Sequence, residues 1–254
     1  MSKIKITSPN DGVLQLNIHR PDKKNALDKG MYKALAEAIR EADTDKSIRC
    51  VILTGSEGVF TSGNDLSDFL NVSFESAEQN PVLEFMTALR DLSKPIIAAV
   101  EGPAVGIGTT LLLHCDFVYA GPGAMFSLPF AKLGLCPEFA SSLLLPRLAG
   151  MLRATEWLLL AEPFDVNEAY AGGLVTSIVE YPLEQAVLIA NVLVKRAPEA
   201  LRNSKRLLRE SQNSSVDDVM ARELSCFSKA LSGPEFAEAG RAFFEKREPN
   251  FELK

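Results

Sequence analysis

Histidine is scarce in this chain, because its 254 residues include only two, His19 and His114. Zinc sites and Ser-His-Asp triads depend on histidine, so neither is expected and we predict no metal site. Cysteine is also sparse, and the cysteines are scattered through apolar stretches. That pattern is typical of free, buried thiols in a reducing compartment rather than of disulfides or metal ligands. They are Cys50, Cys115, Cys136 and Cys226.

Long apolar runs and an excess of basic residues are missing as well. No stretch approaches the roughly 18 consecutive apolar residues of a membrane-spanning helix. The net charge of −6 and the isoelectric point near 5.2 argue against a nucleic-acid-binding surface. Residues 1–12 lack the apolar core of a signal peptide, and the last residues are not a peroxisomal tripeptide. We therefore expect a cytoplasmic protein.

Strand and helix patterns alternate along the chain as far as residue 179, and everything after it is helical. Interleaving of this kind predicts an α/β protein. A broken helical region is expected at 64–92, and Asp28 or Asn25 is expected to cap the helix that follows the loop at 20–28. The expected strands lie at 3–8, 13–19, 50–55, 95–100, 116–120 and 174–179, and the expected later helices at 146–160, 183–195, 198–211, 216–231 and 234–246.

Residues 94–138 contain the most informative order of features. A buried strand, a small-residue turn, a helix start and a second strand are followed by one isolated acid, Glu138. The turns at 60–66 and 102–108 each precede a helix start, where backbone N–H groups are free to bind an anion. The two turns suggest a pair of donors for a developing oxyanion. A plainer interpretation of each is a helix cap at 60–66 and tight packing of a turn at 102–108.

Glu138 is the candidate base because its neighbours are apolar. Partial desolvation would raise the pKa of its carboxyl group and make it a stronger base. The alternative is a helix-start glutamate that pairs with Arg147. Asp116 is the rival acid, but we interpret it as an anchor for backbone, and His114 as a packed or capping residue. The cations and aromatic pair at 241–247 suggest either closure over a phosphate-bearing ligand or a solvated helix end.

Taken in order, the motifs of the chain resemble the crotonase (enoyl-CoA hydratase/isomerase) superfamily over essentially its whole length. The matching stretches lie at 17–27, 60–66, 94–106, 168–175 and 243–247. Within the superfamily, three motifs look most like the Δ3,Δ2-enoyl-CoA isomerases. They are Ser-Gly-Asn-Asp-Leu at 62–66, Gly-Pro-Ala-Val-Gly-Ile at 102–107 and Pro-Glu-Phe-Ala-Ser-Ser at 137–142.

The resemblance implies an architecture and a ligand. It implies a crotonase-like spiral of ββα repeats at residues 1–195, followed at 196–254 by a helical C-terminal region that mediates trimerisation. The expected assembly is a homotrimer, or a hexamer built as a dimer of trimers. The expected substrate is an acyl-CoA thioester. Because coenzyme A is part of that substrate, no separate cofactor is expected.

The resemblance also implies roles for individual residues. The oxyanion donors would be the backbone N–H groups of Asn64 and Ile107, and Glu138 would be the base. Further residues are expected to contact the CoA or acyl part of the substrate, the last two of them in a neighbouring subunit. They are Lys24, Ala26, Ser62, Gly63, Asp65, Leu66, Gly106, Phe243 and Lys246.

The positions that depart from the hydratases decide between the two best-known activities. Hydratases of the superfamily use two glutamates to position and activate water, and Thr110 and Phe130 occupy those positions here. The isomerases instead use one acid where Glu138 stands. We therefore predict an isomerase that converts 3-enoyl-CoA to trans-2-enoyl-CoA in fatty-acid β-oxidation. The alternatives are an enoyl-CoA hydratase or another crotonase-type reaction, a non-catalytic acyl-CoA binding module, and RNA binding.

Overall fold

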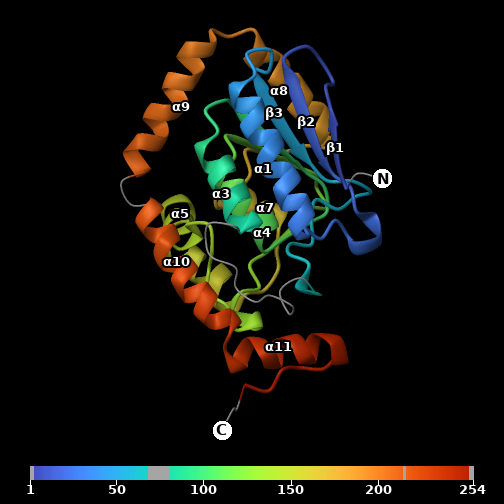
Figure 1. Ribbon diagram of the computed structural model, residues 1–254, viewed down its shortest axis with the longest axis vertical. Coiled ribbons are helices and arrows are strands. Elements are labelled where there is room, and N and C mark those ends of the chain that lie inside the picture. Colours follow the sequence, from blue (N-terminus) through green and yellow to red (C-terminus); the bar gives the residue numbers. More distant parts are fainter. Residues whose placement is uncertain (1–2, 68–79, 214–215, 252–254) are drawn as a thin grey trace.

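The computed structural model describes residues 3–67, 80–213 and 216–251 (Figure 1). These residues form two sheets. The larger sheet has six strands in the order β1-β2-β3-β4-β6-β9, in which β1 and β2 form an antiparallel hairpin and the other neighbours are parallel. Its strands are Ile4–Thr7, Val13–Ile18, Cys50–Thr54, Ile96–Val100, Phe117–Ala120 and Ser177–Ile178. The smaller sheet has three strands in the order β5-β7-β8, at Pro103–Val105, Met125–Ser127 and Phe164–Asp165. The predicted α/β class is confirmed.

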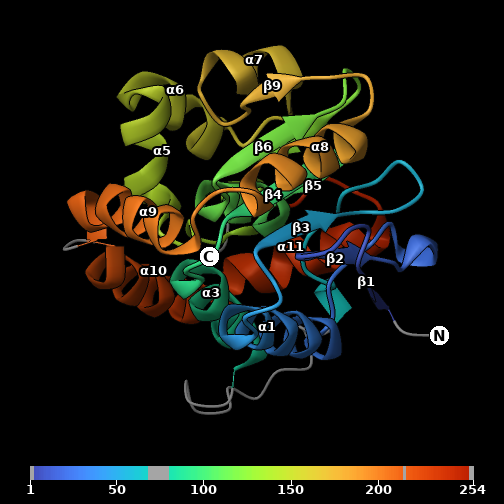
Figure 2. The same ribbon diagram turned by 90° about the horizontal axis from the view of Figure 1, so that it is seen from above.

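Helices cover both faces of the larger sheet (Figure 2). The α-helices are α1 (Lys29–Thr44), α3 (Pro81–Asp91), α4 (Ile107–Thr110), α5 (Ser141–Ala149), α6 (Met151–Thr155), α7 (Val166–Ala171), α8 (Pro182–Val194), α9 (Pro198–Asn213), α10 (Val216–Leu231) and α11 (Pro234–Glu245). Alternate residues of a strand point to opposite faces. Leu53 and Ala98 therefore lie in the core that contains α1 and α3, whereas Ile52 and Ile97 lie in the core that contains α8.

The local signals for most elements are confirmed, with three differences. The helix expected at 146–160 is divided into three parts. Helix α5 ends at Ala149, and the next residue, Gly150, has a φ of 79° that is unfavourable for other residues. Helix α6 follows, and then a π-helical segment, Glu156–Leu160. The strand expected at 174–179 is reduced to β9. The smaller sheet was not expected, because strands of two or three residues show no alternation. Of the broken helical region, α3 is confirmed, and residues 68–79 lie outside the described residues.

Asp116 ties the C-terminal helices to the sheet, as its interpretation as an anchor predicts. Its carboxylate accepts a hydrogen bond from the Ile96 N–H at 2.8 Å and pairs with Lys205 of α9 at 2.7 Å. Lys205 Nζ also donates to the Lys94 carbonyl at 2.6 Å, and Arg209 lies 3.3 Å from Asp116. Burial lowers the pKa of Lys205 to about 8 even with this carboxylate beside it. The division into regions at residue 195 stays a prediction.

Replacing Asp116 with asparagine is expected to lower the free energy of unfolding by about 3 kcal/mol, because it leaves a buried ammonium without its counter-charge. Asp217→Asn is the matched control. It removes a carboxylate that is 72% exposed and paired with Arg90, so its effect is expected to stay below about 1 kcal/mol. Urea unfolding at pH 7 measures both changes. Equal effects of the two substitutions would contradict the anchoring role of Asp116.

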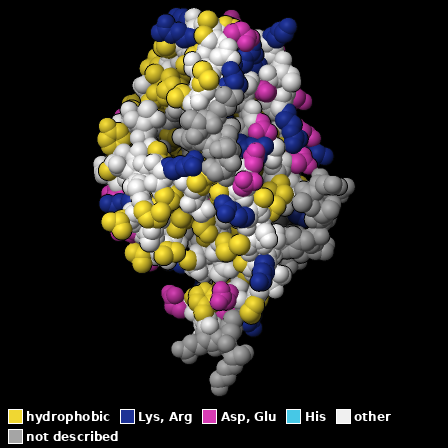
Figure 3. All heavy atoms as spheres, turned by 90° about the vertical axis from the view of Figure 1, so that its left-hand side faces the viewer, with side chains coloured by type: hydrophobic (Ala, Val, Ile, Leu, Met, Phe, Trp, Pro, Cys, Tyr) yellow, Lys and Arg dark blue, Asp and Glu magenta, His cyan; other side chains and the backbone are white. Residues whose placement is uncertain are grey.

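Large apolar side chains are exposed on the side of the molecule formed by α5, α6 and α9. Figure 3 looks at this side and shows hydrophobic side chains gathered across it. They include Leu148 of α5, Met151 and Leu152 of α6, Leu159 and Leu160 of the π-helical segment, and Leu207 and Leu208 of α9. Apolar surface of this extent is typical of a contact between proteins. Trimerisation and a cytoplasmic location stay predictions. Along the described ranges, no helix is both long and apolar enough to cross a bilayer.

Candidate active site

The segment at 60–66 follows β3 and is held by the loop before α1. Asn25 is fully buried, and its side-chain amide donates to the carbonyls of Ser56 and Val59. Thr61 Oγ1 donates to the Asn25 carbonyl at 2.7 Å. Asn25 is thus a structural hub rather than the helix cap, which is Asp28, whose side chain accepts from the α1 backbone.

The segment at 102–108 lies directly against the first one. The Val105 N–H donates to the Thr61 carbonyl at 3.0 Å. A Cβ at Gly63, where φ is +86°, would lie 2.7 Å from the Val105 carbonyl oxygen, and a Cβ at Gly108 would lie 2.5 Å from Thr61 Cγ2. Both positions therefore require glycine, because a larger residue would keep the two segments apart. The turn at 102–108 does pack tightly, as the plainer interpretation holds.

Asn64 and Ile107 each present a backbone N–H group that has no acceptor among the described residues. Leu27 pairs with the atoms on either side of Asn64: its N–H donates to Gly63, and its carbonyl accepts from Asp65. The N–H of Asn64 therefore points away from Leu27. Ile107 is the first residue of α4, where no earlier turn supplies an acceptor. Both N–H groups are therefore available to a ligand, and their predicted role as oxyanion donors stays a prediction.

Glu138 is buried beside α4, and only 6% of its surface is exposed. Its carboxylate accepts a hydrogen bond from the Thr110 hydroxyl at 3.4 Å. Burial, with a smaller contribution from the charge of Glu223, raises the pKa of Glu138 to about 8. In the part of the chain that the structure describes, Glu138 does not pair with Arg147, so the alternative interpretation as a helix-start ion pair is wrong.

Tyr32 of α1 lies close to both Asn64 and Glu138. Its hydroxyl donates to the side-chain oxygen of Asn64, and its ring packs 5.5 Å from that of Phe85. Burial and the nearby Glu138 carboxylate raise the pKa of Tyr32 well above its usual range. Tyr32 thus links Asn64, to which it is hydrogen-bonded, with Glu138, which bonds Thr110 of α4. This contact could not be predicted from the sequence, because Tyr32 lies among the apolar residues of α1.

The predicted ligand contacts divide into two groups. Lys24, Ala26 and the segment at 62–66 lie together: the Ser62 N–H donates to the Lys24 carbonyl, and Arg20 bonds both the Ala26 carbonyl and the Asp65 carboxylate. Gly106 precedes the Ile107 donor with a φ of 56°. The half-buried Leu66 begins a helical turn beyond Asp65. These residues lie beside Asn64 and Ile107, and their predicted contact with the substrate stays a prediction.

Phe243 and Lys246 are not joined to this group. They lie at the exposed end of α11, which projects at one end of the molecule beside the C-terminus (Figure 1). Phe243 is 59% exposed and contacts the ring of Phe244 edge-on. No described contact links either residue to Glu138. Their expected contact with the CoA of a neighbouring subunit stays a prediction.

The remaining candidates serve the structure. His114 Nε2 donates to the Phe139 carbonyl at 2.9 Å, and burial lowers the pKa of His114 to about 3, so it is a packed, neutral histidine as interpreted. The four cysteines are free, as predicted. The expectation that all of them are buried holds for Cys50 alone: Cys115 and Cys136 are half-buried, and Cys226 is exposed on α10.

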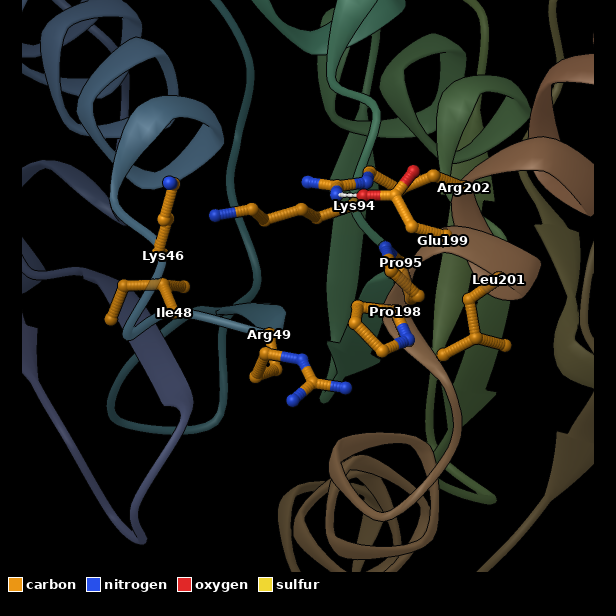
Figure 4. Close-up of a pocket in the computed structure, with 9 residues that line it drawn as sticks. All are labelled: Lys46, Ile48, Arg49, Lys94, Pro95, Pro198, Glu199, Leu201 and Arg202. Carbon is orange, nitrogen blue, oxygen red and sulfur yellow. Dashed lines mark hydrogen bonds and ion pairs between the residues drawn. The ribbon is translucent and has the colours of Figure 1, made fainter.

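A separate pocket of about 350 Å³ lies at the opposite edge of the larger sheet, between the starts of β3 and β4 and helix α9 (Figure 4). Asn64 and Ile107 instead follow the carboxyl ends of β3 and β4, where ligands bind in open parallel sheets. Cations line the pocket, but Lys94 donates to the carbonyls of Ala42 and Asp45, and Arg202 pairs with Glu199. The Glu138 group is therefore the candidate active site.

Comparison with known proteins gives the family. The model of the enoyl-CoA hydratase/isomerase family matches residues 8–254. The chain is 34% identical to peroxisomal enoyl-CoA delta isomerase 3 of Mus musculus over 97% of this chain and 80% of that protein. It is 32% identical to the 2,3-dehydroadipyl-CoA hydratase of Escherichia coli over 97% of both.

Comparison with solved structures gives the same family. A crystal structure of an enoyl-CoA hydratase/isomerase from Pseudoalteromonas atlantica matches with a TM-score of 0.94 and 42% identity, over 98% of this chain and 100% of that chain. The predicted crotonase-like fold is thereby confirmed. Because the relatives include proteins named as isomerases and as hydratases, similarity alone does not select the reaction. The chain belongs to the enoyl-CoA hydratase/isomerase family of enzymes.

Proposed function

We propose that this enzyme is a Δ3,Δ2-enoyl-CoA isomerase of fatty-acid β-oxidation, which converts 3-enoyl-CoA to trans-2-enoyl-CoA. The observation that carries the proposal is that the buried carboxylate of Glu138 lies beside the hydroxyl of Thr110, which stands in place of the first hydratase glutamate. Hydration requires water to be activated and a proton to be delivered by two acids. Neither Thr110 nor the buried Phe130 can do so. One carboxylate suffices for a proton shift.

In the proposed reaction, the thioester oxygen accepts hydrogen bonds from the N–H groups of Asn64 and Ile107. The Glu138 carboxylate removes a proton from C2, and the electron pair of that C–H bond forms a dienolate whose charge the two donors stabilise. The protonated Glu138 then returns the proton to C4, and the double bond moves from C3–C4 to C2–C3. No atom is gained or lost. Initial rates of isomerisation by the purified protein test the proposal.

The pH dependence of isomerisation is expected to report the ionisation of Glu138. Only the carboxylate can accept the C2 proton, and burial raises the pKa of Glu138 to about 8. The ratio kcat/KM is therefore expected to rise about tenfold per pH unit below 8 and to level off above it. A profile measured from pH 5.5 to 9.5 checks this.

Thr110→Val is the matched variant for the pH profile. The Thr110 hydroxyl lowers the pKa of Glu138 by donating to its carboxylate, so its removal is expected to move the acid limb of the profile to higher pH. A wild-type profile that stays flat between pH 6 and 9 would count against Glu138 as the base.

A further inference from the structure

The backbone directly after Glu138 is strained. Phe139 and Ala140 have φ values of 56° and 57°, in the left-handed region that residues with a side chain rarely adopt. Each such residue costs about 1–2 kcal/mol relative to a right-handed conformation. Two successive residues of this kind persist only where their surroundings hold them, and such strain is concentrated at functional sites.

Glu223 of α10 holds this strained turn through hydrogen bonds to its backbone. Its carboxylate accepts from the Ala140 N–H at 2.6 Å, from the Ser142 N–H at 2.9 Å and from the Ser142 hydroxyl. The N-cap of α5 is Ala140, which has no side chain able to accept a hydrogen bond. Glu223 thus supplies from 83 residues away the cap that the local sequence lacks.

His114 contacts the same turn. The His114 ring stacks on Phe139 with centroids 3.7 Å apart, in addition to its hydrogen bond to the Phe139 carbonyl. The N–H and hydroxyl of Ser141 donate to the Glu138 carbonyl at 3.0 and 2.6 Å. Together with the hydrogen bonds of Glu223, these contacts restrain the backbone of the turn.

The charges that act on Glu138 and on Glu223 come from α10. Glu223 is 7% exposed, and its negative charge adds to burial in raising the pKa of Glu138. Tyr32 and His114 also face Glu138 or its turn, but both stay neutral near pH 7, and Arg222 acts on Glu223. Glu223 is therefore the charged group that acts on the base.

We propose that Glu223 is a positioning residue, which holds the left-handed turn at Phe139 and Ala140 from helix α10 and thereby fixes Glu138 beside Thr110. The proposal rests on the proposed function of Glu138 as the base. Glu223 thereby links helix α10 to the chemistry. It determines where the carboxylate of Glu138 lies and which negative charge that carboxylate faces.

Glu223→Gln tests the proposal, because it keeps the length of the side chain and removes its charge and one acceptor. We expect kcat to fall about 10²-fold with little change in KM, since a small displacement of a base has an effect of that size. We also expect the acid limb of the kcat/KM profile to move to lower pH, because a buried negative charge near Glu138 is gone. Asp217→Asn, on the same helix but exposed, is expected to change neither quantity.

Two further measurements keep the outcome decisive. Glu223→Asp keeps the charge but is too short to bridge Ala140 and Ser142, so kcat is expected to fall without the shift in pH; it also serves if Glu223→Gln does not fold. Infrared titration of the Glu138 carboxyl group, assigned by difference from Glu138→Gln, needs no substrate and tests the coupling even if the wild-type protein does not isomerise 3-enoyl-CoA. A Glu223→Gln protein with wild-type kcat and wild-type Glu138 titration would overturn the proposal, as would a loss of kcat explained by unfolding alone.

Discussion

Replacing Glu138 with glutamine is expected to lower kcat for isomerisation at least about 10²–10⁴-fold, the usual contribution of a general base. The amide has nearly the same shape and can still accept from Thr110, but it cannot take the C2 proton. Binding of CoA is expected to be unchanged, because the residues that border the donors are untouched. Stopped-flow rates and calorimetric titration with CoA measure the two effects. Near-normal turnover in the variant would remove Glu138 from the mechanism.

The same substitution is expected to stabilise the fold at high pH. Folding raises the pKa of Glu138 from 4.5 to about 8, so the folded protein retains a proton that the unfolded chain releases. The associated stability is present below pH 4.5 and falls as the pH rises to 8, by up to about 1.4 kcal/mol per pH unit. Glu138→Gln removes this loss. Urea unfolding at pH 5 and pH 8 should therefore favour the variant more at pH 8, which also excludes unfolding as the cause of its inactivity.

Removal of the Ile107 N–H is expected to reduce kcat/KM about 10²–10³-fold, the effect of losing one oxyanion donor. Ile107→Pro achieves this, because proline lacks the N–H and is tolerated at the first position of a helix. Ile107 is fully buried, so the lost packing must be measured separately. Ile107→Ala loses at least as much side chain but keeps the donor. Equal rates for the proline and alanine variants would contradict the assigned donor.

Features set by neighbouring residues were predictable from the sequence. The cap at Asp28 and the strands β3 and β4 follow from short-range patterns, and the proposed donors, Asn64 and Ile107, lie in contiguous motifs. The anchoring role of Asp116 also followed from its place at the start of a strand. In each case the residues that determine the feature are close together in the chain, so the sequence displays them side by side.

Features that depend on distant residues were not predictable. Tyr32 meets Asn64 and Glu223 meets Ala140 only after folding, and in the sequence each belongs to an ordinary amphipathic helix. Glu223 in particular looks like a solvated residue of α10 until the missing cap of α5 is seen. The smaller sheet escaped prediction for a related reason: its strands are too short to show a pattern and are defined by their partners.

The central claim, a one-base proton shift rather than hydration, is tested most directly by assaying both reactions with the same purified protein. Initial rates of 3-enoyl-CoA isomerisation and 2-enoyl-CoA hydration are compared across a series of acyl chain lengths. We predict that isomerisation exceeds hydration by about 10²-fold or more at the preferred length, because Thr110 and Phe130 stand at the two positions where hydratases carry their acids. Hydration as fast as isomerisation at every length would contradict the account.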